Sequence, residues 1–147
     1  MKMINTHQVS LQTKLETIVQ CMDILKRYEN ISLQEYVSDF RIQLVVERAI
    51  QSTILIAIRI SCSILSHINI DESAIDLNEA FIELGKYNVI NLELARQLAP
   101  TTGLANHLTY EYDSIDHNRV FRAIKSTLQQ YSLYVQQINT YLTSTLA

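Results

Sequence analysis

Residues 44–65 read LVVERAIQSTILIAIRISCSIL, and they lie within a segment from about 39 to 67 that contains neither glycine nor proline. Ile54, Ile56, Ile58 and Ile60 alternate as in a strand, but strands usually span about 3–10 residues and this segment is far longer. We therefore predict a helix here. Because apolar residues cover most of its circumference, we expect it to be the central helix of the fold.

Turn-forming residues are also scarce in the rest of the chain. Two glycines and one proline in 147 residues amount to about 2%, against roughly 12% in average proteins. A β-sandwich or barrel needs many turns, so these folds are excluded. The chain is long enough to bury a core without disulfides or metals. The prediction is an all-α fold, an antiparallel bundle of four long helices plus short helices, in a single domain over residues 1–147.

Apolar spacing and capping residues place the other helices. We expect an amphipathic helix from about 7 to 28, a short helix over SLQEYVSD (32–39), a loop over INIDES (68–73) and a long last helix from about 117 to 144. DLNEAFIELG (76–85) is predicted to be a helix with Gly85 as its left-handed C-cap. Pro100 should interrupt the helical region between LELARQLA and LANHLTYEY. The expected N-caps are Ser32, Asp76, Asn91 and Asp116.

Several common functional motifs are absent from the sequence. It has no glycine-rich phosphate loop, GxSxG elbow, HExxH motif or paired cysteines, so we expect no P-loop enzyme, no zinc site, no metal and no cofactor. The first residues, MKMINTHQVSLQTK, lack the apolar core of a signal peptide, and Arg59 interrupts the most apolar stretch. We therefore expect a cytoplasmic protein without a membrane span. The net charge of −3 means that any nucleic-acid surface must come from local clustering of basic residues.

The stretch GLANHLTYEYDSID (103–116) is the most informative one for function. It resembles the signature of the HEPN superfamily, and most closely that of its HepT branch. The resemblance extends in order and spacing over roughly residues 40–140. The positions in step with the family pattern are Gly103, Leu104, Asn106, Leu108, Glu111, Tyr112, Asp113, Ile115 and Asp116.

This resemblance implies a dimeric, RNA-directed toxin. In the family, two motif-bearing helices of a homodimer form a shared cleft for metal-independent cleavage of RNA, such as tRNA. The resemblance further implies an antitoxin partner, a minimal nucleotidyltransferase of the MntA type, which attaches adenylyl groups (AMPylation) at the position of Tyr112. Alternatively, Tyr112 packs at a subunit interface with its hydroxyl satisfied. Independently, Ile56, Ile60 and Ile64 suggest more apolar circumference than one small bundle needs, which favours a dimer.

Two positions depart from the family pattern. The position of the catalytic arginine holds Ala105, and that of the catalytic histidine holds Tyr110. Alanine has no cationic fork, and a phenol is a poor general base at neutral pH. An active ribonuclease and a catalytically inactive homologue, acting as a dimeric partner-binding or RNA-binding module, therefore both stay open. A helical adaptor with an accidental likeness to the family is a third alternative.

The remaining candidates for catalysis are Asn106, His107 and Tyr110. His107 precedes Tyr110 by three residues, about 4.5 Å along a helix axis, so its imidazole is able to reach the same cleft. Tyr110 is interpreted either as a second AMP acceptor or as a filler of the cleft.

The other charged and titratable residues give weaker signals. Arg119, Arg122 and Lys125 step by three along the last helix and are the candidate RNA-binding residues. The other histidines lie near the expected helix ends, where surface or capping roles are expected: His7, His67 and His117.

Overall fold

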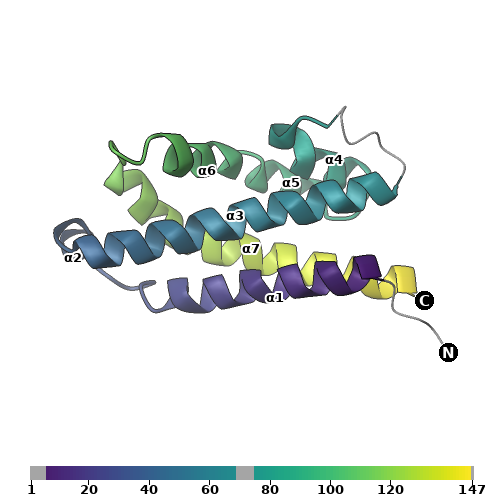
Figure 1. Ribbon diagram of the computed structural model, residues 1–147, viewed down its shortest axis with the longest axis horizontal. Coiled ribbons are helices and arrows are strands. Elements are labelled where there is room, and N and C mark those ends of the chain that lie inside the picture. The colour runs from purple at the N-terminus through teal and green to yellow at the C-terminus, as the bar shows by residue number, and fades with distance from the viewer. Residues whose placement is uncertain (1–5, 69–74, 147) are drawn as a thin grey trace.

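The computed structural model describes residues 6–68 and 75–146, and three long helices form its body (Figure 1). α3 (Phe40–His67) runs through the middle, packed against α1 (Thr6–Lys26) and α7 (His117–Leu146). The shorter elements are α2 (Leu33–Ser38), η2 (Leu77–Glu79), α4 (Ala80–Lys86), α5 (Leu92–Leu98) and α6 (Thr101–Tyr110). The described residues contain no strand, which confirms the predicted all-α fold. Most of the expected loop, residues 69–73, lies outside the described ranges.

Short helices fill the fourth position of the predicted bundle. α4, α5 and α6 lie along the side of α3 opposite to α1 (Figure 1). Pro100 separates α5 from α6, because proline lacks the backbone N–H that a continuous helix would use. The connection between α6 and α7 lies at the same end of the bundle as α2, at the left of Figure 1.

The predicted helix starts are confirmed. At each one a side-chain oxygen accepts a backbone N–H of the first turn, over distances of 2.7–3.1 Å. Asp39 does the same for α3, through the N–H groups of Arg41 and Ile42. The capping residues that the sequence indicated are Ser32, Asp76, Asn91 and Asp116.

The predicted left-handed C-cap at Gly85 is wrong. Gly85 lies inside α4 and is not left-handed; the left-handed residue of this region is Asn88, with φ 59°. Gly85 is instead required by packing, because a Cβ there would lie 2.8 Å from the Cβ of Ala95 in α5. The missing side chain lets α4 and α5 approach closely.

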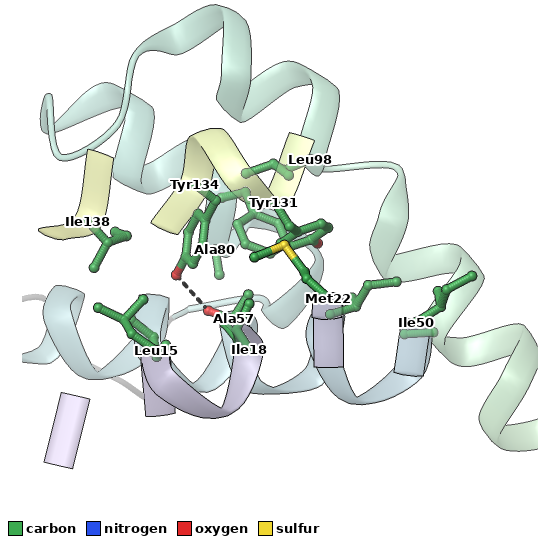
Figure 2. Packing of buried hydrophobic residues seen from close by; sticks show 14 of the residues in the cluster. Leu15, Ile18, Met22, Ile50, Ala57, Ala80, Leu98, Tyr131, Tyr134 and Ile138 are labelled. Carbon is green, nitrogen blue, oxygen red and sulfur yellow. Dashed lines mark hydrogen bonds between the residues drawn. The ribbon is translucent and has the colours of Figure 1, made fainter. Parts of the chain in front are cut away.

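Three buried aromatic rings join α7 to the rest of the bundle. Tyr134 donates a hydrogen bond to the carbonyl of Ala57 in α3 at 2.9 Å (Figure 2). The Tyr131 hydroxyl lies 2.6 Å from the Thr101 hydroxyl at the start of α6. Both rings pack edge-on against Phe81 of α4. Burial raises the pKa of both phenols, so they stay neutral. These contacts fix α7 relative to α3 and α6, which carry the candidate site.

The apolar central helix is covered mainly by its own chain. By length and composition alone, α3 is long and apolar enough to cross a membrane. However, 56% of its most apolar stretch is buried inside the fold, and the core helices of soluble proteins are often as long and as apolar. Ile60 and Ile64 are fully buried, and Ile56 is half-buried. The monomer therefore already uses the apolar surface of Ile60 and Ile64, and these residues do not support the predicted dimer.

Candidate functional site

The connection between α6 and α7, residues 111–116, presents tyrosine to solvent; we call it the tyrosine loop. Tyr112 lies within it, and Tyr110 is the last residue of α6. Each side chain is 77% exposed. The loop is a tight turn, because the N–H of Ser114 donates to the carbonyl of Glu111 at 2.9 Å. Tyr110 therefore fills no cleft within the single chain, and both phenols are open to a partner.

His107 ties the two ends of the tyrosine loop together. Its side chain is buried, and its Nδ1 hydrogen bonds the Glu111 carboxylate at the start of the loop. Its Nε2 accepts the backbone N–H of Asp116 at 3.0 Å, at the end of the loop. Because Nε2 accepts, the neutral ring carries its proton on Nδ1, which donates to Glu111. Both nitrogens are thus used inside the chain, and the predicted catalytic role of His107 would require this clamp to open.

Replacing His107 by alanine should therefore destabilise the fold. The substitution removes a partly buried hydrogen bond to the N–H of Asp116, which costs about 0.5–1.5 kcal/mol. Urea unfolding of both chains measures the difference. His67→Ala is the control, because His67 is exposed and is the last residue of α3, at the opposite end of this helix from α2. Its loss should change the free energy of unfolding by less than about 0.5 kcal/mol. Equal free energies of unfolding for the two variants would show that the His107 hydrogen bonds do not stabilise the fold.

The position of the family arginine faces the core. Ala105 is 1% exposed, and its carbonyl accepts a hydrogen bond from Thr109, which in turn accepts one from Gln51 of α3. Its neighbour Asn106 is exposed. Position 105 therefore contributes no polar side chain to the surface of α6, and a cation for RNA must come from another element.

The structure separates the three predicted RNA-binding residues. A Cβ added at Gly103 would lie 3.6 Å from Nη2 of Arg119, so this guanidinium lies over the first turn of α6, one turn from Asn106. Arg122 and Lys125 instead line a pocket on the other side of α7, together with Glu29 of the connection between α1 and α2. Of the three, only Arg119 is placed next to α6.

A polar cluster at the start of α7 was missed by the sequence analysis. Nδ1 of His117 lies 3.8 Å from Oε2 of Glu47 in α3, and the ring of Tyr36 in α2 packs edge-on against the imidazole. Burial raises the pKa of Glu47, while the nearby imidazoles of His117 and His107 oppose the shift. One signal was available in the sequence: Glu47 is an acidic residue within the apolar segment of the central helix.

Within the described residues, no three histidine, cysteine, aspartate or glutamate side chains are grouped so that they could hold a metal ion. The site therefore consists of a clamped tyrosine loop, a cation over α6 and an imidazole–carboxylate pair. An all-α bundle in which a short helix leads through such a loop into a long last helix is the architecture that the resemblance to the HEPN superfamily implies.

Sequence comparison gives the family. The family model described as "Ribonuclease HepT-like" matches residues 18–138, and the chain belongs to this family. A protein named "tRNA nuclease HepT", from Aphanizomenon flos-aquae (strain 2012/KM1/D3), is 51% identical over 140 residues, which cover 95% of each chain.

Solved structures share the fold at low sequence identity. An AMPylated HEPN toxin of Shewanella oneidensis, described as tri-AMPylated and in complex with MNT antitoxin, is 19% identical with a TM-score of 0.78. The match covers 93% of this chain and 99% of that one. A toxin–antitoxin structure with AMP-PNP gives the same TM-score at 20% identity, covering 88% of this chain and 97% of the other. The chain is thus a homologue of HepT-like HEPN toxins.

Proposed function

We propose that this chain is the HEPN component of a toxin–antitoxin pair, that it acts on RNA as a homodimer, and that a minimal nucleotidyltransferase of the MntA type controls it by AMPylating Tyr112. The observation that carries the proposal is the exposure of Tyr112. This residue is 77% exposed, and it lies in the tyrosine loop, whose two ends His107 of α6 holds by hydrogen bonds. The AMPylated state and MNT antitoxin of the Shewanella toxin support the choice of partner.

The chemistry explains why such a modification would inhibit. An adenylyl group on Tyr112 would add negative charge and bulk at the loop between α6 and α7, and its charge would repel the phosphates of an RNA that lies along α6 towards Arg119. The same surface would thus serve RNA in the free chain and carry the inhibitory group in the modified one. The name of the curated relative supports tRNA as the RNA, and the proposed setting is the cytoplasm, without a membrane partner.

A homodimer is supported by exposed apolar side chains at the end of the bundle that carries the tyrosine loop. Phe40 is 70% exposed and Leu44 is 51% exposed, and they lie one turn apart at the start of α3. This start of α3 follows α2 directly, so it lies at the end of the bundle that carries the loop (Figure 1). Isologous pairing there would cover both residues and bring two loops together.

A second candidate function follows from the buried Ala105. With no arginine at this position, a chain that keeps its dimer and its antitoxin surface would serve as a partner-binding or RNA-binding module without cleavage. The two candidates differ in one product: the first yields RNA fragments in the presence of EDTA, and the second yields none.

The proposal is tested by adding an MntA-type nucleotidyltransferase and ATP to the purified chain. We expect a stable complex and a mass gain of whole AMP groups on this chain, measured by mass spectrometry of the intact protein. Growth arrest on expression, reversed by the same partner, is the expected cellular result. If neither a complex nor AMP transfer is found, the proposed control by a nucleotidyltransferase is wrong.

Arg119 should carry more of the RNA affinity than the other basic residues of α7. Arg119→Gln is expected to weaken tRNA binding and to lower the slope of log affinity against log salt by about 0.7–0.9, the contribution of one phosphate contact. Fluorescence anisotropy at several salt concentrations gives the slope. Lys125→Gln removes the same charge on the α1 side of α7 and should leave the slope unchanged. Equal loss in both variants would contradict the placement of RNA beside α6.

A further inference from the structure

The two groups that the family uses on RNA are missing at positions 105 and 110, but another imidazole lies next to the tyrosine loop. His117 is the first residue of α7 and follows directly after Asp116, whose N–H is held by the His107 clamp. Its side chain is 38% exposed, against 9% for His107. Of these two histidines beside the loop, His117 is the one that solvent reaches.

The orientation of the His117 ring follows from its contacts. Nδ1 is buried and has no hydrogen-bond partner among residues 6–68 and 75–146, and it lies 3.8 Å from the Glu47 carboxylate. Tyr36 packs against the ring from α2, with the ring centroids 6.3 Å apart. Because Nδ1 is buried, the exposed part of this side chain, 38% of its surface, belongs to its other atoms.

This arrangement favours proton transfer by His117. The Glu47 carboxylate, 3.8 Å from Nδ1, stabilises the imidazolium electrostatically, and Nε2, which forms no hydrogen bond within the described residues, would exchange a proton with the substrate. His107 lacks this freedom, because both of its nitrogens are bonded within the chain. The two histidines thus differ in role: His107 holds the loop, and His117 is available for chemistry.

We propose that His117 is the catalytic base of RNA cleavage by this chain and that Glu47 is its positioning residue; this proposal rests on the proposed action on RNA. His117 takes the proton of a ribose 2′-hydroxyl, and the 2′-oxygen bonds to the adjacent phosphorus. The bond from phosphorus to the 5′-oxygen breaks, and the departing 5′-oxygen takes a proton from water. The products are a 2′,3′-cyclic phosphate and a 5′-hydroxyl, and His117 returns its proton to solvent. Besides the RNA and His117, water is the reactant that the step requires.

The test compares tRNA cleavage in EDTA by the full chain and its variants. We expect fragments that end in a 2′,3′-cyclic phosphate, and a loss of about 100-fold or more in His117→Ala. Added imidazole should restore part of the activity of this variant, which a purely structural role of His117 would not allow. Glu47→Gln should lower kcat while the KM for tRNA stays the same. His67→Ala serves as the control at the opposite end of α3 and should cleave like the unchanged chain.

Three outcomes would overturn the inference. They are undiminished cleavage by His117→Ala, a loss that imidazole does not restore in a variant shown by urea unfolding to be folded, and the absence of cyclic-phosphate products from the unchanged chain. AMP transfer to Tyr112 is measured on the same preparations. If AMP transfer succeeds while the unchanged chain yields no fragments, the control by a nucleotidyltransferase stands, and both RNA cleavage and the role of His117 are lost. If the unchanged chain cleaves and His117→Ala cleaves equally well, only the role of His117 is lost.

Discussion

Tyr112→Phe is expected to abolish AMP transfer to the chain, whereas Tyr110→Phe should keep it. The phenolic oxygen of Tyr112 would attack the α-phosphorus of ATP, with release of pyrophosphate and of the phenol proton to solvent. Phenylalanine lacks this oxygen and keeps the ring, and a substitution at so exposed a side chain should change stability by less than about 0.5 kcal/mol. Mass spectrometry after reaction with the nucleotidyltransferase and ATP measures the AMP content of each variant.

Tyr110 is a matched control, because it is as exposed as Tyr112 and lies only two residues away. It differs in position: it ends α6, while Tyr112 lies inside the loop that His107 closes. If Tyr112→Phe still receives AMP and Tyr110→Phe does not, Tyr110 is the acceptor. AMP on both single variants and on neither tyrosine of the double variant would show that the two act as alternative acceptors.

Local signals in the sequence were sufficient for the helix starts. The side-chain caps and the break at Pro100 depend on residues within one turn of each other, and they appear where the sequence indicated. Gly85 was misassigned because its requirement comes from Ala95 in the next helix. The apolar face at Ile60 and Ile64 was misjudged for the same reason, since a periodic pattern does not show which helices of the same chain cover it.

The candidate site was only partly predictable from the sequence. The motif located Tyr112 and the loop, and the exposure of Tyr112 agrees with an acceptor. The three-residue spacing of the basic residues in α7 could not predict that Arg119 lies next to α6 while Lys125 lies on another side of α7. Which neighbour each side chain meets depends on how α6 and α1 pack against α7. The bond from His107 to the N–H of Asp116 spans nine residues, and the contact of Glu47 with His117 joins α3 to α7. Neither contact has a signature in local spacing.

Removal of the Phe81 ring should cause the largest loss of stability. Phe81 is fully buried, and its centroid lies 6.3 Å from that of Tyr131 and 5.8 Å from that of Tyr134, both in edge-on geometry. Phe81→Ala loses these contacts and leaves a cavity between α4 and α7, at a cost of about 3–5 kcal/mol. A domain of this size is stable by about 5–15 kcal/mol, so a large share of its stability depends on one ring. Urea unfolding measures the change in midpoint.

Tyr87→Ala is the control for Phe81→Ala, because it also deletes an aromatic ring, at the residue that follows α4. Tyr87 is 48% exposed, so its removal should cost less than about 1 kcal/mol. Similar losses in the two variants would mean that burial of Phe81 against the α7 tyrosines does not hold the bundle together. If the difference is as expected, Phe81→Ala should also lower AMP transfer to Tyr112 near its unfolding midpoint, since the loop is held between α6 and α7, and Tyr131 of α7 contacts Thr101 of α6.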